Sequence, residues 1–391
     1  MRKIANAVFA TLTVGIALVA MPASAQVGKS VAKTATPTAT PLATIEATPT
    51  SPLPTATPYP GLRAGFETNF QVMNPLSLSG RIAFSTPIDG YERILVLDLN
   101  SGRVRKLIDG PGNNYFPTWS HDGRKITFTS DRDGNKEIYV ADWDGTNQIR
   151  LTNNAVTDDN PTWTPDDKHV VYYSDATASD ESDSNLFMVS VSGGTPAQLT
   201  KFTGRNTTPR VSPDGSLISY STNRFWPGWD VCIWNLHSKA ESCPLQGKAS
   251  FCRGAWSPSG KLFAYSFGLL DAVEVGYITS GTKDKKPLTE MGGKEYDPVW
   301  SPSESLVAFV GDSEVRGTFN LYVVDLQRKV TPLLKSTYSI RYPTWSGTKT
   351  FELEAERLRQ AEVKEDQEEQ RARELLASTP PQSPAPEVAG H

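Results

Sequence analysis

The sequence predicts an all-β fold, a six-bladed β-propeller of four-stranded antiparallel blades closed by a C-terminal strand, with a charged α-helix after it. Two observations lead to this prediction. A unit of four short strands recurs along the chain. The first unit lacks an innermost strand, and the end of the array has one strand without further strands after it.

The repeating unit is clearest in residues 116–152, where three Asp-Gly pairs separate short runs of β-branched and aromatic residues. Asp-Gly is a strong hairpin signal because the tightest turns need positive φ, which Gly, Asn and Asp tolerate. Ile126 and Phe128 alternate with polar residues, as strands with one buried face do. Ile149 and Leu151 show the same alternation. The unit is therefore a four-stranded antiparallel meander.

The unit recurs with an anchor that usually reads Trp-Ser/Thr-Pro/His. The six anchor positions are Trp119, Trp163, Val211 (in the place of Trp), Trp256, Trp300 and Trp345. They are 44, 48, 45, 44 and 45 residues apart. A period of about 40–45 residues with four strands per period is typical of a β-propeller, and six anchors predict six blades.

The ends of the array predict how the ring closes. The last anchor, Trp345, has no further strands after it, whereas the first strand signal, residues 81–85, has no anchor before it. We expect the strand at Trp345 to become the innermost strand of the first blade, which leaves no open ring edge. Blades 1 to 6 would then comprise 81–109 with 342–346, 116–152, 160–200, 207–246, 253–290 and 297–334.

The repeats resemble the TolB-type, WD40-like PD40 β-propeller family, whose pattern is roughly P-x-W-S-P-D-G, an Ile/Phe strand, S-D-R-D-G-N-x-E-I-Y and L-T. Residues 117–152 match this pattern almost position by position, and a weaker match covers about 81–346. The resemblance implies the fold, because the motifs build blades rather than a site. TolB carries an α/β domain before its propeller, and residues 27–62 are too short and Pro-rich for one. We therefore do not transfer its role in the cell-envelope Tol system.

The N-terminal region predicts export. Residues 1–25 combine two early basic residues, an apolar run from 7 to 21 and an Ala-Ser-Ala site, as a signal peptide does. An uncleaved anchor is the alternative, although the run is shorter than the roughly 20 residues of a spanning helix. No transmembrane segment is expected after cleavage, so the protein would be periplasmic, envelope-associated or secreted. Residues 26–62, rich in Thr and Pro, predict a disordered, semi-rigid linker.

The propeller is expected to occupy residues 63–348, and the composition then changes. Residues 349–378 are dense in Glu, Gln and Arg, with opposite charges at helical spacing, such as Glu354 and Arg357. This predicts a charged helix that is either a solvated single helix or one that docks on the propeller or self-associates. Residues 379–391 predict a disordered Pro-rich tail.

Composition excludes some classes of function. The net charge is only −4 and no Lys/Arg stripe is present, which argues against a nucleic-acid-binding protein. The four His are spread around the ring rather than clustered as metal ligands, and we expect no cofactor. Calcium is an alternative for the acidic loops 130–135 and 175–185, which equally fit ordinary turns and a solvated loop.

Three cysteines suit an exported protein. Cys232 and Cys243 flank a turn, and folding this hairpin symmetrically places them opposite each other, which predicts a disulfide. Pairing of Cys243 with Cys252, or three buried thiols, are the alternatives.

Topology selects the binding surface. In a propeller the connections between blades and the hairpins between second and third strands lie on the same face. This face is here called the mouth face. The residues just ahead of each first strand should form a mixed ring there: Tyr115, Phe116, Asp159, Asn160, Thr207, Thr208, Arg253, Tyr296, Asp297, Arg341 and Tyr342. On the same face the blade-4 hairpin carries Phe225, Trp226 and Trp229. These three aromatics form either an exposed docking patch or a group folded back over the blade.

The motifs favour binding over catalysis. No Gly-x-Ser-x-Gly elbow is present, and no α/β segment that could carry a hydrolase follows the propeller. The leading hypothesis is a monomeric, exported, non-enzymatic protein that docks a protein, peptide or envelope polymer on its mouth face. The alternative is a propeller hydrolase or lyase that uses channel carboxylates, such as Asp159 and Asp297, as acid and base. A purely structural role of the C-terminal helix and tail is a third hypothesis.

Overall fold

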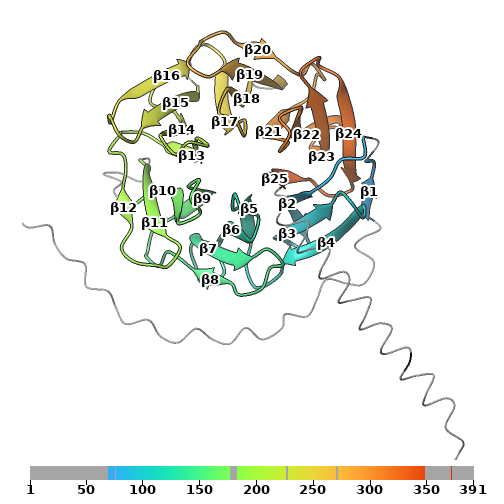
Figure 1. Cartoon of the computed structure of the whole chain (residues 1–391), viewed down its shortest axis with the longest axis horizontal. Coiled ribbons are helices and arrows are strands. Elements are labelled where there is room, and N and C mark those ends of the chain that lie inside the picture. The colour runs from blue at the N-terminus through green and yellow to red at the C-terminus, as the bar shows by residue number, and fades with distance from the viewer. Residues whose placement is uncertain are drawn as a thin grey trace, which may run out of the picture. The chain divides into compact units, whose positions relative to one another are not determined.

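The computed structural model describes residues 69–347, except 75, 177–182, 226–227 and 270–271, and in addition Arg371. The predicted signal peptide, linker, tail and, apart from Arg371, charged helix lie outside these residues. The described residues form six antiparallel sheets arranged in a ring (Figure 1). Two cavities lie along the channel at its centre. The predicted six-bladed propeller is therefore confirmed. No helix in this part of the chain is long and apolar enough to cross a membrane.

Each blade is a four-stranded meander that runs outward from the channel. The innermost strands, in blades 1 to 6, are β25 (Arg341–Ser346), β5 (Asn114–Trp119), β9 (Asp158–Trp163), β13 (Asn206–Val211), β17 (Ser250–Trp256) and β21 (Glu295–Trp300). The second strands are β2 (Arg81–Ile88), β6 (Lys125–Ser130), β10 (His169–Ser174), β14 (Leu217–Thr222), β18 (Leu262–Leu269) and β22 (Leu306–Val315).

The outer strands complete each sheet. The third strands are β3 (Tyr91–Asp98), β7 (Glu137–Asp142), β11 (Asn185–Ser190), β15 (Asp230–Asn235), β19 (Ala272–Thr279) and β23 (Thr318–Asp325). The fourth strands are β4 (Arg103–Ile108), β8 (Ile149–Arg150), β12 (Ala197–Gln198), β16 (Glu241–Leu245), β20 (Lys286–Pro287) and β24 (Val330–Ser336). Because neighbouring strands are antiparallel, the second-to-third hairpins and the blade connections share the mouth face, and the Trp-Ser-Pro turns lie on the opposite, far face.

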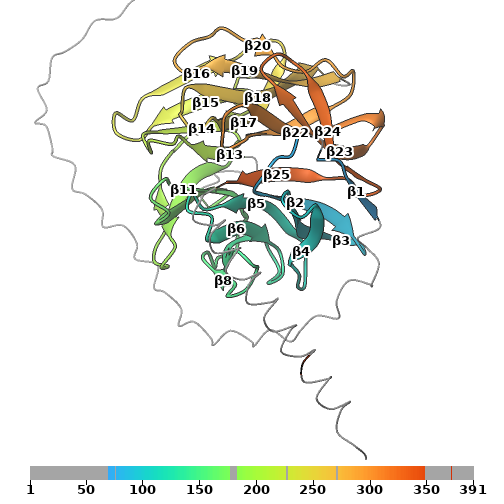
Figure 2. The same ribbon diagram turned by 45° about the vertical axis from the view of Figure 1, so that its right-hand side comes forward.

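The ring is closed at two places. As predicted, β25 enters blade 1 as its innermost strand, with Ile82 opposite Trp345, and the two strands lie side by side in Figure 2. A further strand, β1 (Phe70–Val72), pairs with β24 at the outer edge of blade 6. The chain therefore joins blade 6 to blade 1 near both ends of the described region. The sequence analysis missed β1 because three residues are too few to show strand alternation.

The hydrophobic core lies between neighbouring blades rather than inside any one of them. Ile94 and Val96 of blade 1, for example, form one buried cluster with Ile126 and Phe128 of blade 2. The prediction for the outermost strand of blade 2 was partly wrong, because Ile149 is 50% exposed. This strand, β8, has only two residues and forms the outer edge of its sheet.

Three of the anchor tryptophans join adjacent blades through their indole N–H groups. Trp163 donates to the carbonyl of Thr118 in the preceding blade at 2.9 Å. Trp256 and Trp300 make the equivalent bonds to Arg210 and Ala255, each at 3.1 Å. A large apolar ring with a single donor can fill the seam between two blades and also satisfy a carbonyl there. This explains why the repeat carries tryptophan at its anchor.

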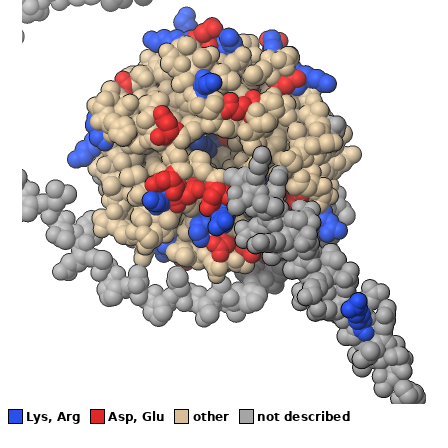
Figure 3. Space-filling model, in the orientation of Figure 1, with Lys and Arg blue, Asp and Glu red and all other residues tan. Residues whose placement is uncertain are grey.

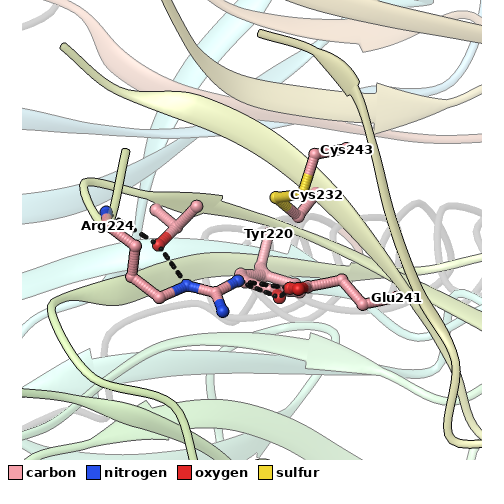
Figure 4. The surroundings of a disulfide bond; sticks show 6 residues. Tyr220, Arg224, Cys232, Glu241 and Cys243 are labelled. Carbon is pink, nitrogen blue, oxygen red and sulfur yellow. Dashed lines mark hydrogen bonds and ion pairs between the residues drawn. A yellow bond between two sulfur atoms is a disulfide. The ribbon is translucent and has the colours of Figure 1, made fainter. Parts of the chain in front are cut away.

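A disulfide links the two outer strands of blade 4. Cys232 on β15 is bonded to Cys243 on β16, and Cys252 remains a free thiol. Beside the disulfide, Glu241 accepts hydrogen bonds from the Tyr220 hydroxyl and the Arg224 guanidinium (Figure 4). Covalent and charge-assisted contacts therefore both hold β16, the edge strand of this blade.

The second closure can be tested with Phe70→Ala. The Phe70 ring lies 6.0 Å from that of Phe84 in blade 1 and 6.3 Å from that of Tyr338 after blade 6, measured between centroids. Because Phe70 is only partly buried, its truncation should lower the free energy of unfolding by about 1–2 kcal/mol, measured by urea denaturation. Phe225→Ala, at an exposed ring, is the control, with an expected change below about 0.5 kcal/mol. Equal stabilities of the two variants would contradict a stabilising role of β1 in closing the ring.

Candidate binding site at the mouth of the channel

Every innermost strand carries a β-bulge near its mouth-face end. At this point the pairing with the second strand shifts register in all six blades. One residue of each bulge has a left-handed backbone: Phe116 (φ 49°), Asn160 (56°), Thr208 (51°), Arg253 (52°), Asp297 (57°) and Tyr342 (53°). The prediction that these residues precede the first strands is thus wrong in detail, because they lie within them.

Contacts with the preceding blade hold the left-handed conformation. Proline is not its cause, although five of the six residues precede one, because a following proline favours extended conformations with negative φ. The bulge releases backbone N–H groups, and side chains of the preceding blade accept hydrogen bonds from them. Asn160 donates to Thr129 Oγ1, Arg253 to Ser221 Oγ and Tyr342 to Asp297 Oδ2, each at 3.2 Å. A left-handed non-glycine residue costs about 1–2 kcal/mol, so contacts between blades hold this ring in place.

The bulge residues border two cavities in the channel. The mouth cavity has a volume of about 500 Å³, and the far cavity, among the Trp-Ser-Pro turns, has about 360 Å³. Phe116 and Arg253 border both cavities. Figure 3 shows the hollow at the centre of the ring, with atoms of a basic side chain inside it. The channel is therefore divided at the level of the bulges.

A cluster around Arg253 forms this division. Its Nη1 donates to both carboxylate oxygens of Asp297, at 3.0 and 3.2 Å. The guanidinium carbon lies 4.9 Å from the ring centroid of Tyr296 and 5.4 Å from that of Tyr342. The rings of Tyr342 and Phe116 are 3.9 Å apart between centroids. An ion pair enclosed by aromatic rings is thus fixed between the two cavities.

Seven of the residues predicted for the mouth face meet in the mouth cavity. Its lining includes Phe116, Asn160, Thr207, Thr208, Trp229, Arg253 and Tyr296. Trp229 is held there by its backbone, whose N–H donates to Ser250 Oγ at 3.3 Å and whose carbonyl accepts the N–H of Phe251 at 2.7 Å. Asp297 and Tyr342 border the far cavity.

The remaining predicted residues lie outside these linings. Tyr115 is covered by the Lys136 ammonium, 5.0 Å from its ring centroid. Arg341 forms an ion pair with Glu92 at 2.5 Å. Phe225 is exposed at the tip of its hairpin, and Trp226 lies outside the described residues.

Sequence reasoning missed several residues that line the mouth cavity, among them Tyr173, Arg205 and Cys252. Arg205 stands one position before β13, outside the pair of residues selected in each blade. Tyr173 lies at the end of β10 among apolar residues that predict only core. Cys252 was considered only as a disulfide partner. The signal that could have found Arg205 is its position at the blade connection.

The two carboxylates of the alternative enzyme hypothesis have protein partners. Asp159 accepts from Lys136 Nζ at 2.7 Å and from the Tyr173 hydroxyl at 3.1 Å. Asp297 accepts from Arg253 and from the backbone of Tyr342. Both carboxylates therefore fix neighbouring groups in the wall of the channel.

The acidic loops that the sequence analysis considered for calcium also bind protein donors. Asp131 accepts from the backbone N–H of Asn113 at 2.6 Å and from its side chain at 2.8 Å, and Asp183 accepts from the backbone of Gly204 at 2.6 Å. Within the described ranges, the group of side chains close enough to share a metal ion is Cys232, Glu241 and Cys243. Two of these three are joined in the disulfide.

The exposed apolar side chains of the mouth face are unevenly distributed among the blades. Among the described residues seven large hydrophobic side chains are exposed, and four of them lie at second-to-third hairpins. These four, here called the apolar arc, are Tyr91 (40% exposed), Phe225 (45%), Leu269 (61%) and Val315 (59%). They belong to the consecutive blades 4, 5, 6 and 1. Among the described residues, the corresponding hairpins of blades 2 and 3 expose no large hydrophobic side chain. They carry Asp131, Asp133, Asp175 and Asp183.

A buried carboxylate pair lies at the junction of blades 2 and 3. Glu137 and Asp158 are both 0% exposed, and the Thr152 hydroxyl donates to Glu137 at 2.5 Å. Burial raises the pKa of the Asp158 carboxyl to about 6, and the charge of Glu137 adds to the rise. Hydrogen bonds to the Asp158 carboxyl, including one from Ser174, lower the pKa but do not offset the effect of burial. At the next junction Asn206 stands at the position of Asp158, as the first residue of β13, and is also fully buried.

Asp158→Asn should therefore change how stability depends on pH. Between about pH 4 and 6 the folded state retains a proton on Asp158 that the unfolded chain loses, so this group makes stability fall as pH rises. The asparagine variant lacks this loss and should gain about 2 kcal/mol relative to the wild type between pH 4 and 7, measured by urea denaturation. The reciprocal Asn206→Asp should introduce such a dependence. Parallel pH profiles of wild type and Asp158→Asn would contradict this assignment.

The strain in the ring can be tested at Thr208. Thr208→Gly relieves a left-handed β-branched residue but loses the 2.7 Å hydrogen bond between the Thr208 and Ser221 hydroxyls. These effects should nearly cancel, leaving the free energy of unfolding within about 0.5 kcal/mol. The matched control Thr207→Gly, at an extended neighbour, should lose about 1–2 kcal/mol. A larger loss at position 208 than at 207 would show that the backbone there is not strained.

Comparison with known proteins agrees with this fold. The sequence pattern of the Tricorn protease N-terminal β-propeller domain matches residues 79–199, which include most of the first three blades. No curated protein matches the sequence significantly.

Several solved structures are similar. TolB from Acinetobacter baumannii is 19% identical with a TM-score of 0.59, over 69% of this chain and 67% of that chain. A putative TolB from Agrobacterium tumefaciens is 16% identical with a TM-score of 0.53, over 69% and 100%. Hydrazine synthase from Kuenenia stuttgartiensis is 14% identical with a TM-score of 0.60, over 70% and 48%. At these identities the likeness shows the fold alone.

Proposed function

We propose that this protein is an exported, non-enzymatic binding protein that docks a partner polypeptide on its mouth face. The observation that carries the proposal is the position of the apolar arc. It lies on the face where the mouth cavity opens, and the cavity is bordered by Trp229, Tyr296 and Arg253. Trp, Tyr and Arg are the residues enriched at the energetic centres of protein interfaces.

The apolar arc favours a polypeptide partner over a polysaccharide. Leu269 and Val315 expose about three fifths of their side chains at hairpin tips. Aliphatic groups cannot hydrogen-bond to sugar hydroxyls, whereas apolar side chains form the buried centre of protein interfaces. The acidic hairpins of blades 2 and 3 would form the polar rim of the same surface.

Export is supported by two features. Residues 1–25 have the pattern of a signal peptide, and the Cys232–Cys243 disulfide suits an oxidising compartment. The twice-closed ring supplies a rigid platform, so the docking surface is formed before the partner arrives and little ordering entropy is lost on binding.

The proposal can be tested by capture from the envelope fraction of the producing cell, with the chain from residue 26 onward as bait. Leu269→Asp with Val315→Asp should reduce retention of the specific partner at least tenfold, because it places charge in the apolar arc. Leu326→Asp is the matched control, since Leu326 is an exposed leucine in the third-to-fourth turn on the far face. Equal retention by the double variant and the wild type, or no retained protein, would overturn docking at the mouth face.

A further inference from the structure

The mouth cavity has a charge imbalance. Two arginines, Arg205 and Arg253, border it, and none of its lining residues is acidic. The whole chain has a net charge of −4, so this cationic character is local. A cavity lined by one sign of charge attracts ligand groups of the opposite sign.

The guanidinium of Arg253 is only partly used by the protein. Asp297 accepts from Nη1, and within the described residues no acceptor takes a hydrogen bond from Nε or Nη2. The rings of Tyr296 and Tyr342 fix the guanidinium plane. Arg253 therefore keeps ordered N–H donors at the boundary between the two cavities, and recognition of a planar anion requires such donors.

The guanidinium of Arg205 has no anionic partner in the described part of the chain. No carboxylate lies within 4 Å of it, and no side-chain hydrogen bond from it is formed there. The nearby Asp159 is bound by Lys136 and Tyr173. Burial raises the pKa of Asp175, and the charge of Arg205 opposes this shift from beyond ion-pair distance. A partly buried guanidinium with five donors and no acceptor is a favourable place for an anion.

We infer that the mouth cavity binds a carboxylate carried by the docked polypeptide, with Arg205 and Arg253 as its donors. This inference rests on the proposed function and names the chemistry that the cavity recognises. A volume of about 500 Å³ accommodates a side chain or a chain end, and not a folded domain. Trp229 and Tyr296 would pack against the apolar part of the inserted segment. The carboxylate can come from the C-terminus of the partner or from an Asp or Glu side chain.

The reactivity of Cys252 can report whether a ligand occupies the mouth cavity. Cys252 is the free thiol among the three cysteines of the chain, and it lines the mouth cavity. Burial raises the pKa of its thiol to about 11, so its alkylation is slow and depends on access. A ligand in the cavity should slow the reaction of Cys252 with N-ethylmaleimide, whereas a ligand bound elsewhere should leave the rate unchanged.

The test uses immobilised chain from residue 26 onward and four probes, which are three random peptide pools and one oligosaccharide. The first has a free C-terminal carboxylate and no Asp or Glu, and the second has Asp and Glu but an amidated C-terminus. The third has neither carboxylate. The fourth replaces the peptides with a uronate oligosaccharide. Retention and the rate of Cys252 alkylation are measured for each.

The first or second pool should be retained at least tenfold better than the third, and it should slow alkylation of Cys252. Whichever of the two is retained identifies the source of the carboxylate. Arg205→Gln should abolish this preference, and Arg205→Lys should keep part of it because the charge remains. Arg103→Gln, at an exposed arginine of β4, should leave it unchanged. Unaltered thermal unfolding of Arg205→Gln would exclude misfolding as the cause.

Three outcomes would overturn the inference. Equal retention of all three peptide pools would leave docking in place but remove the role of the carboxylate. Retention of the uronate oligosaccharide alone would show that the anion belongs to a polysaccharide. If no probe is retained, the cavity does not recognise carboxylates, and capture from the envelope fraction separately decides whether the mouth face docks a protein.

Discussion

Closure of the ring is the constraint on which the rest of this structure depends. Each blade buries its apolar residues against its two neighbours, so a blade without a neighbour would expose half of its core. The pairing of β25 with β2 and of β1 with β24 removes both ends of the array. Only in a closed ring do six bulges meet around one channel, where the blade-to-blade hydrogen bonds hold their strained backbones.

The repeated elements could be predicted from the sequence, and the elements that occur once could not. Anchors such as Trp119 and Trp300 and the Asp-Gly turns specify blades through local chemistry, and the orphan strand at Trp345 specifies closure. The short β1 has no such signal, because its place is set by the edge of blade 6. The exposure of Ile149 was mispredicted for a similar reason, since alternation does not show how far a sheet extends.

The candidate site was predicted in its location and only partly in its composition. Topology identified the mouth face, and Phe116, Asn160 and Arg253 do line the channel. Their left-handed backbones were not predicted, because the hydrogen bonds that stabilise them come from residues such as Thr129 and Ser221 of the preceding blade. Arg205 was missed because its importance lies in the absence of a carboxylate beside it, which only three-dimensional packing reveals.

At the six bulges, the same backbone conformation occurs with six different kinds of side chain. Phenylalanine, asparagine, threonine, arginine, aspartate and tyrosine occupy six equivalent positions with φ between 49° and 57°. Because the preceding blade holds the conformation, the side chain can be exchanged at bulge positions that do not themselves hold the next bulge, whereas the Asp297 carboxylate accepts the N–H of Tyr342. The channel is therefore lined by six structurally equivalent positions that accept different side chains. Duplicated copies of such a propeller could acquire new ligand preferences through single substitutions, at little risk to folding.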